Sequence, residues 1–478
     1  MKSRLLNFTF AFGLLAGCSV GPNYRRPDVL ESPQLPATFS VAPTNSVEWK
    51  TAEPSANLPR GAWWKIFTDL ELNRLESLAG SQNQSLLAAA AQLEQARSLL
   101  RVAQADYYPQ ISAVPSLTRQ RTSINAPQQG HAAGSSYTYN TFAVPADLNW
   151  EIDLWGRVRR QSEAAKARFN AAVDDLESAR LVTQAAVAAS YFELRALDAQ
   201  SALVSDTVAA YEHSLALVQN RRKGGIVSDL DVSQAESQLS AAQAALPALE
   251  LQRVNLLHAL AVLCGKPAID FSISTNGFAS EVIPAIPPRL PAELLERRPD
   301  IAAAERRMAA ANADIGGAKA AFFPKIVFSG LGGFESVGAN SLFDWPSRIW
   351  AVGPSLNLPI FEGGRLRAQL AVTRAAYDEA VANYRQTALT AFQEVEDQLA
   401  AQRLLAAQLD AQKNALRAAR QTLAIANNRY KQGLVTYLEV ATAQSAALAT
   451  EQAVVQLQGQ RLAAEVGLIK ALGGGWGR

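Results

Sequence analysis

The chain contains little of the material from which metal centres, disulfide scaffolds and nucleic-acid surfaces are built. Its 478 residues include two cysteines and three histidines, and His131, His213 and His258 are too scattered for metal-ligand spacing. Lysine and arginine number 45 against 43 acidic residues, so the charge gives no argument for a nucleic-acid partner. No nucleophile–base pair or phosphate-binding loop stands out. We therefore predict that the protein is not an enzyme and holds no metal or other cofactor.

Proline is absent from two long stretches, 146–246 and 360–478. Both are rich in alanine, glutamine, leucine, glutamate and arginine, which are good helix formers. The pattern predicts two helices, over 157–223 and 365–432, each roughly 65 residues and about 100 Å long at 1.5 Å per residue. Helices of this length need lateral partners, because a single helix with polar faces buries little surface.

The first residues have the pattern of a bacterial lipoprotein signal. A basic start precedes an apolar stretch over 5–16, and Leu-Ala-Gly stands directly before Cys18. The resemblance implies that 1–17 is a signal peptide and that Cys18 carries fatty acyl chains, palmitate among them, as a covalent lipid anchor rather than a span. Ser19, where aspartate would retain a lipoprotein in the inner membrane, favours the outer membrane. Cys264 has no disulfide partner left and is predicted to be a small core residue.

The rest of the chain is predicted to contain an internal two-fold sequence repeat. ADYYPQIS at 105–112 matches AAFFPKIV at 320–327, and NRRKGGIVSDLDV at 220–232 matches NRYKQGLVTYLEV at 428–440. Each half then contains a helix, two strands, a long helix and a returning helix. The predicted parts after the signal are a Pro-rich N-terminal strap, a first repeat and a second repeat, at 18–60, 61–288 and 289–478.

Four segments of alternating polarity lie between the helices, at 110–121, 139–149, 325–334 and 349–360. About ten residues is the length of a tilted membrane-spanning strand. Aromatic side chains gather at their helix-side ends, as at membrane–water interfaces: Tyr107, Tyr108, Trp150, Trp155, Phe322, Phe323 and Phe361. Soluble β-hairpins with core aromatics are the alternative. Because four strands cannot close a barrel and lipid does not tolerate open edges, a membrane location requires a dimer or a trimer.

Taken together, these features resemble the TolC-like outer-membrane efflux factors, in the lipoprotein branch that serves tripartite RND efflux pumps. The resemblance rests on the lipoprotein signal, GPNYRRPDV at 21–29, RRPDI at 297–301, the Pro-containing strand entries and the paired glycine turns, and it covers essentially the whole chain. It implies a mixed α and β fold, in which a homotrimer forms an all-antiparallel transmembrane β-barrel, with four strands per protomer and 12 in total. The barrel would be continuous with a long periplasmic α-helical barrel.

The resemblance also implies a function and partners. The protein would be the gated exit duct of an RND pump in the cell outer membrane, passing small toxic compounds from the periplasm to the outside. Its partners would be a periplasmic adaptor protein, an inner-membrane RND pump and outer-membrane lipid. The alternatives are an outer-membrane channel of a protein-secretion system and a periplasmic lipid-anchored coiled-coil scaffold.

The two matching turns carry residues with a local structural explanation. Gly225 and Gly433 suit the left-handed residue that ends a helix. A Ser or Thr followed three residues later by an acid is the pattern of a capping box, and it occurs as Ser228 with Asp231 and as Thr436 with Glu439. Helix capping alone is therefore one interpretation of these acids.

The resemblance adds a functional interpretation of the same turns. It implies a channel gate formed by Asp231, Tyr430, Leu438, Glu439 and Thr442. Within this gate Tyr430 and Asp231 match a lock between helices, Glu439 matches an acidic ring, and Leu438 is a candidate apolar constriction. Thr442 stands where relatives often carry aspartate, and the lock's arginine is replaced by Val435 or Ser445.

Two further groups complete the expected sites. The implied adaptor contacts are the turn residues Gly225, Ile226, Val227, Ser228, Gly433, Leu434, Val435 and Thr436. Arginines follow the strand exits, and we expect them either near phospholipid head groups or at a solvated helix start: Arg157, Arg159, Arg160, Arg365 and Arg367.

Overall fold

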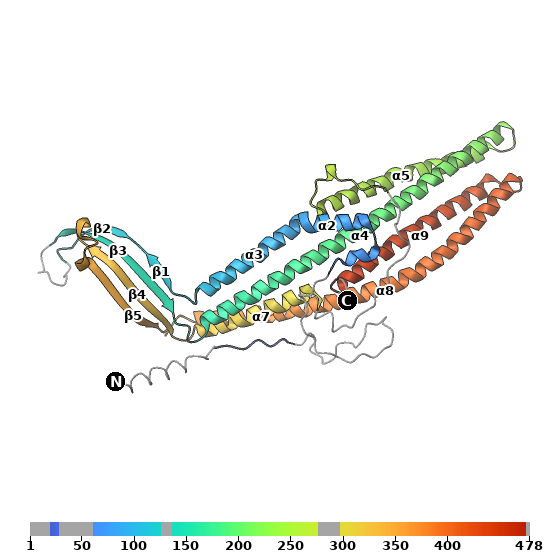
Figure 1. Ribbon diagram of the computed structural model, residues 1–478. Helices are drawn as coiled ribbons and strands as arrows, with labels where there is room; N and C mark the ends of the chain where they lie inside the picture. The colour runs from blue at the N-terminus through green and yellow to red at the C-terminus, as the bar shows by residue number, and fades with distance from the viewer. Residues whose placement is uncertain (1–19, 28–60, 126–135, 276–296, 475–478) are drawn as a thin grey trace. The chain divides into compact units, whose positions relative to one another are not determined.

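The computed structural model describes residues 20–27, 61–125, 136–275 and 297–474, and helices dominate these ranges (Figure 1). Four short 3-10 helices accompany seven α-helices in the part described. The α-helices are α2 (Leu70–Gln82), α3 (Gln84–Ala105), α4 (Arg157–Lys223), α5 (Asp229–Leu263), α7 (Pro299–Ala320), α8 (Arg365–Lys431) and α9 (Tyr437–Ala471). The 3-10 helices are η1 (Trp63–Phe67), η2 (Ala268–Asp270), η3 (Ala339–Ser341) and η4 (Trp345–Ser347).

The two long helices α4 and α8 have 67 residues each, and the helices that return from them, α5 and α9, have 35 each. The sequence patterns predicted long helices over 157–223 and 365–432. Each long helix and its return helix form a helical hairpin (Figure 1). Among the described residues, no helix combines the length and the apolar character needed to cross a membrane.

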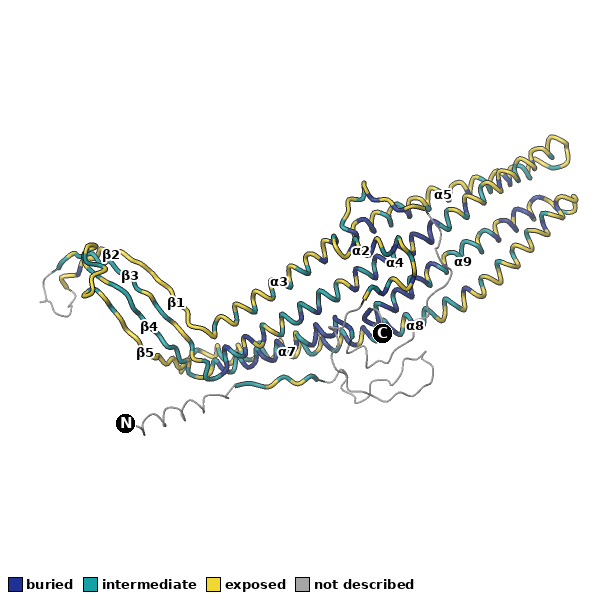
Figure 2. Tube along the Cα trace, viewed as in Figure 1, coloured by how far each residue is buried: buried dark blue, intermediate teal, exposed yellow. Residues whose placement is uncertain are grey.

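All described strands belong to one antiparallel sheet. Its order is β1-β3-β4-β5, and β2 also pairs with β3. The strands are β1 (Gln110–Ala113), β2 (Ser116–Arg121), β3 (Thr138–Glu151), β4 (Lys325–Ser336) and β5 (Arg348–Asn357). This order leaves β1 and β2 along one edge and β5 along the other, and both edges are coloured as exposed in Figure 2.

The sheet has five strands where the sequence predicted four segments. The predicted strand 110–121 is divided at Val114–Pro115, because proline has no backbone N–H to donate to the ladder. Both pieces pair with β3 in one continuous register, with Ala113 opposite Ala146 and Ser116 opposite Ala143. β5 ends at 357 rather than at 360, two residues before the next proline.

The chain divides into two compact units, and each takes residues from both halves of the sequence. Of the described residues, one unit contains 20–27, 93–125, 136–172 and 304–384, and the other contains 61–92, 173–275, 297–303 and 385–474. The compact units therefore differ from the predicted repeats 61–288 and 289–478. The long helices α4 and α8 each contribute residues to both units.

The first unit contains the sheet and the short N-terminal stretch 20–27, which lies against its helices. The Val20 N–H donates to the Trp155 carbonyl at 3.0 Å. A Cβ added to Gly21 would lie 2.5 Å from the Cα of Gly316, so this approach requires glycine. Further along, the Tyr24 hydroxyl donates to Glu305 at 3.2 Å. Cys18, the predicted lipid site, lies outside the described residues.

The second unit has a core of α2, α4, α5 and α9 side chains. Leu75, Leu194, Leu260 and Ile469 are almost completely buried in it. Cys264 is a free, buried thiol in the same core, which confirms its prediction as a core residue.

Candidate functional site

The two hairpin turns end their long helices in the same way. In the first turn Gly225 has φ 73°, and the Ile226 N–H donates to the Arg221 carbonyl at 2.9 Å. In the second turn Gly433 has φ 76°, and the Leu434 N–H donates to the Arg429 carbonyl at 3.0 Å. With the glycine N–H groups also bonded three residues back, both turns form a Schellman motif, which satisfies the last helix carbonyls.

The helices that follow the turns begin differently. Ser228 and Asp231 form the predicted capping box, with the Ser228 N–H donating to the Asp231 carboxylate at 2.9 Å. The second capping box is not formed, because the Thr436 side chain makes no cap hydrogen bond. The longer Glu439 side chain instead reaches back across the turn, and its carboxylate lies 3.6 Å from the Arg429 guanidinium. The prediction of two equivalent caps is therefore wrong for the second turn.

Tyr430 lies at the centre of the contact between the hairpins. Its side chain is buried, and the Arg221 guanidinium stands 4.7 Å from its ring centroid. Nη1 of Arg221 also donates to the Tyr430 carbonyl at 3.0 Å. The Tyr437 ring contacts it edge-on, with centroids 5.6 Å apart. Because Arg221 belongs to α4 and Tyr430 to α8, the stacked pair joins one hairpin to the other.

Among the described residues no hydrogen bond joins Tyr430 to Asp231, the two residues expected to form the lock. Within the described part of the chain the Tyr430 hydroxyl is buried and has no hydrogen-bond partner, and the Asp231 carboxylate accepts from Ser228. Burial raises the pKa of Tyr430, Arg221 acts in the opposite direction, and the charge of Asp231 adds to the rise. The acid is therefore near enough to act on the ring electrostatically, and the phenol stays neutral at physiological pH.

A cluster of small and apolar side chains surrounds this pair and packs the two hairpins together near their turns. We call it the tip cluster: Val218, Ala235, Ala426, Tyr430, Tyr437, Val440, Ala441 and Ala443. Gln238 on α5 adds polar contacts to α9, because its Nε2 donates to the Ala441 carbonyl at 2.6 Å and to the Ser445 hydroxyl at 3.0 Å.

The eight expected adaptor-contact residues do not all face outward. Ile226 and Leu434 are 67% and 65% exposed, whereas Val227 and Val435, at the next position of each turn, pack against the tip cluster. The remaining four residues, Gly225, Ser228, Gly433 and Thr436, are exposed. Each turn therefore presents one large apolar side chain to the outside.

The five expected gate residues also fall into two groups. Leu438, Glu439 and Thr442 are exposed near the start of α9, and the Thr442 hydroxyl donates to the Leu438 carbonyl at 2.8 Å. Tyr430 is buried, and Asp231 is half-buried as a helix cap.

Sequence reasoning missed the role of Arg221. It looked for the arginine of the lock at Val435 and Ser445, after the turn, whereas the arginine that contacts Tyr430 precedes the other turn. A signal was present, because an Asn-Arg pair precedes both turns, as Asn220-Arg221 and Asn428-Arg429. In the described ranges, no group of three or more His, Cys, Asp or Glu side chains could hold a metal ion.

Comparisons with known proteins connect this geometry to a family. The family model described as outer membrane efflux protein matches residues 75–266 and 290–474. A toluene efflux pump outer membrane protein of Pseudomonas putida, TtgC, is 33% identical over 476 residues, which are 100% of this chain and 96% of that protein. The outer membrane protein OprJ of Pseudomonas aeruginosa is 35% identical over 468 residues, covering 97% and 94%.

Solved structures agree with the sequence comparisons. The outer-membrane channel OprN has a TM-score of 0.85 and 30% identity, covering 96% of this chain and 100% of that chain. CusC, a protein described as forming a transmembrane channel, has a TM-score of 0.82 and 29% identity, covering 96% and 100%. The chain therefore belongs to the outer membrane efflux protein family, and it acts in the outer membrane as the exit duct of an efflux pump.

Proposed function

We propose that three copies of the chain close their sheets into one twelve-stranded transmembrane barrel, continuous with a periplasmic helical barrel. The observation that carries this proposal is the pair of open sheet edges, β1 with β2 on one side and β5 on the other. Backbone groups at such edges cannot stay unpaired in lipid. The edge of one copy would pair with the opposite edge of the next, and the divided β1–β2 strand counts once, giving four strands per protomer.

The side chains of the edge strands support the same assembly. On β5, Trp350, Val352 and Leu356 are 60–75% exposed and alternate along one face of the strand. Ile111 and Leu117 on the other edge are exposed to a similar extent. Large apolar residues on one strand face fit contact with lipid.

The hairpin turns form the periplasmic gate in this proposal. In each protomer the Arg221–Tyr430 stack and the tip cluster hold the second hairpin against the first, which keeps the pore narrow. Leu438, Glu439 and Thr442 supply the pore-facing groups of the closed end, and Asp231 supports the gate by fixing the start of α5. A ring of three Glu439 carboxylates would attract cations.

The exposed turns supply the docking contacts for a periplasmic adaptor. Ile226 and Leu434 are its apolar anchors, and the neighbouring Gly225, Ser228, Gly433 and Thr436 allow close approach. The adaptor connects the duct to an inner-membrane RND pump, which supplies small toxic compounds. These three components make up the tripartite pump.

A lipid on Cys18 anchors the mature N-terminus in this proposal. Support comes from the Val20 N–H, two residues further on, which bonds to Trp155 at the end of the sheet. The following contacts of Gly21 with Gly316 and of Tyr24 with Glu305 would align the strap with the outer-membrane end of the protomer.

Planar-bilayer recording from the purified, lipidated protein tests the proposal. We expect discrete single-channel currents from particles with the mass of three chains. A membrane-inserted protein that carries no current would contradict the duct, and currents from particles of another mass would contradict the trimer.

A further inference from the structure

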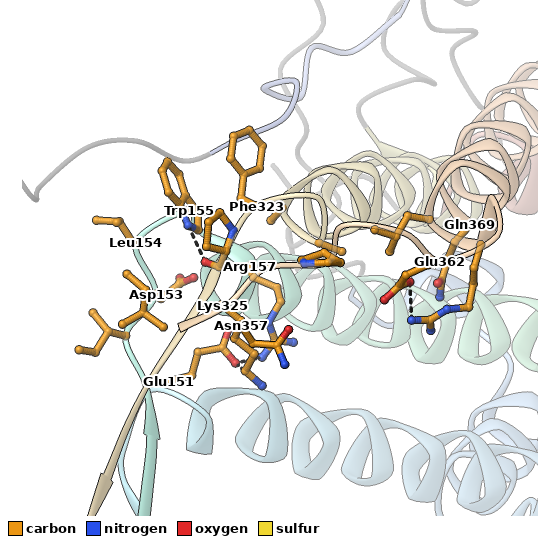
Figure 3. A pocket seen from close by; sticks show the side chains of 18 residues that line it. Glu151, Asp153, Leu154, Trp155, Arg157, Phe323, Lys325, Asn357, Glu362 and Gln369 are labelled. Atoms are coloured by element: carbon orange, nitrogen blue, oxygen red, sulfur yellow. Dashed lines mark hydrogen bonds and ion pairs between the residues drawn. The ribbon is translucent and has the colours of Figure 1, made fainter. Parts of the chain in front are cut away.

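A pocket lies where three strands of the sheet meet their helices, all within the first unit (Figure 3). Its volume is about 370 Å³, and its walls come from the β3–α4, α7–β4 and β5–α8 connections. Pockets that hold small ligands begin at about 300 Å³. This junction pocket is distant in sequence from the hairpin turns, and the proposed gate makes no use of it.

The polar wall of the junction pocket carries both signs of charge. Glu151 accepts from Arg157 at 2.5 Å, and the Lys325 ammonium lies 2.9 Å from the same carboxylate. Two cations on one carboxylate leave a positive charge, and the Lys325 side chain is 50% exposed. Glu362 pairs with Arg365 at 2.5 Å at the other end of the pocket (Figure 3).

Asp153 completes this wall and is already used as a helix cap. Its carboxylate accepts from the Val158 and Arg159 N–H groups at 3.1 and 2.9 Å. The charged lining therefore consists of three acids and three bases, and Lys325 is the cation that shares its carboxylate with a second base: Glu151, Asp153, Glu362, Arg157, Lys325 and Arg365. A lining of this kind matches a ligand that carries one positive and one negative group better than a purely anionic ligand.

The apolar wall contains a fixed aromatic pair. Trp155 stacks on Phe323 with centroids 4.8 Å apart, and its indole N–H donates to the Pro324 carbonyl at 2.9 Å. Figure 3 shows these two rings together on one side of the pocket, away from Glu151 and Lys325. Trp155 is half-buried, and a tryptophan of this kind with a satisfied N–H is typical of the head-group level of a membrane.

We infer that the junction pocket binds the head group of a zwitterionic phospholipid, whose phosphodiester contacts Lys325 and whose primary ammonium contacts Glu362. The inference rests on the proposed function, because the pocket reaches the inner leaflet of the outer membrane only if the sheet spans that membrane. The Trp155–Phe323 pair contacts the glycerol and the first acyl carbons. The three acids and three bases of the lining balance in charge, and a lipid without net charge keeps that balance, whereas an anionic lipid does not.

Native mass spectrometry of the delipidated protein tests this site. The protein is incubated in detergent with equal amounts of phosphatidylethanolamine and phosphatidylglycerol that carry the same acyl chains. We expect phosphatidylethanolamine to be retained about tenfold more, the effect of one charge-assisted hydrogen bond. Equal retention of the two lipids by the unmodified protein would overturn the inference.

Two variants and a control locate the binding. Lys325→Met removes the phosphate contact while Arg157 still neutralises Glu151, so we expect about a tenfold loss of phosphatidylethanolamine. Glu362→Gln should shift the preference toward phosphatidylglycerol, a change that misfolding would not produce. Arg348→Met is the control, because Arg348 lies at the opposite end of the β4–β5 pair, opposite Phe334. A Lys325→Met protein that retains lipid like this control would contradict the site.

A soluble head group separates a lipid site from a metabolite site. Glycerophosphoethanolamine lacks acyl chains, so we expect it to bind far more weakly than the lipid. Equal binding would overturn the lipid assignment. Single-channel currents of the unmodified protein test the duct independently. If the protein carries these currents but does not retain phosphatidylethanolamine, the lipid site is contradicted and the proposed duct is not.

Discussion

The Arg221–Tyr430 stack provides a direct test of how the hairpin tips stay closed. Arg221→Met keeps the length of the side chain and removes its charge. The change removes a cation–π contact worth about 0.5–1 kcal/mol and a hydrogen bond to the Tyr430 carbonyl worth about 1 kcal/mol in this half-buried position. The Tyr430 hydroxyl has no hydrogen-bond partner among the described residues, so no hydrogen bond from this group offsets the loss of the Arg221 contacts.

The expected loss is about 1.5–2 kcal/mol per protomer, which shifts the closed–open equilibrium by a factor of at least about ten. If the three protomers open together, their free-energy losses add, and the factors by which the closed–open equilibrium shifts are multiplied. Planar-bilayer recording measures this as a large fall in the fraction of time spent closed.

Arg429→Met is the matched control, because Arg429 occupies the equivalent helix position of the other turn. Its side chain is half-exposed, and among the described residues its only charged partner is Glu439, at 3.6 Å, a geometry worth about 0–1 kcal/mol. We expect nearly unchanged gating. If the two variants open equally often, or if Arg221→Met stays as closed as the unmodified channel, the stack does not hold the tips and the reasoning is refuted.

Three further predictions follow from other parts of the structure. Gly433→Arg should abolish efflux while trimers persist, because it places a bulky charge on the docking turn at a residue with φ 76°. The control Gly80→Arg, where an added side chain meets open space, should leave efflux intact. Efflux that survives Gly433→Arg argues against adaptor docking at this turn. Glu76→Gln should raise the melting temperature increasingly as pH rises. Glu76 is buried, its carboxylate has no hydrogen-bond partner in the described structure, and burial raises its pKa to about 9. The folded state therefore keeps a proton that the unfolded chain releases above about pH 4.3, and stability falls as pH rises between these two values, by about 4 kcal/mol at pH 7. A melting difference that does not change with pH contradicts this. Gly316→Val should release the strap and speed proteolysis within 20–27, because a Cβ on residue 316 lies 2.8 Å from Arg160 and Gly21 packs against the same residue. In the control Gly317→Val the added side chain meets open space. Equal proteolysis of the two variants speaks against strap docking.

Local chemistry explains which features of the fold were predictable. Helix ends such as Gly225 and Gly433 depend on a backbone conformation that few residues adopt, so their position is visible in the sequence. The absence of proline similarly marked α4 and α8. The interruption at Pro115 follows from the same chemistry, although the alternation of its neighbours concealed it.

Contacts between distant segments explain what the sequence did not reveal. Arg221 and Tyr430 are 209 residues apart, and only the packing of the two hairpins brings them together. The failed cap at Thr436 depends on where the Arg429 side chain lies, because Glu439 is long enough to reach it. The compact units could not be read from the repeat, since each is assembled from helices of both halves.

The central claim is that this chain forms a trimeric duct whose hairpin tips close it. Single-channel recording from the lipidated protein, compared with its Arg221→Met variant, tests this most directly. We predict discrete currents from particles of three chains, with brief channel openings in the unmodified protein and prolonged openings in the variant. A protein that inserts into the bilayer yet passes no current in either form would contradict it.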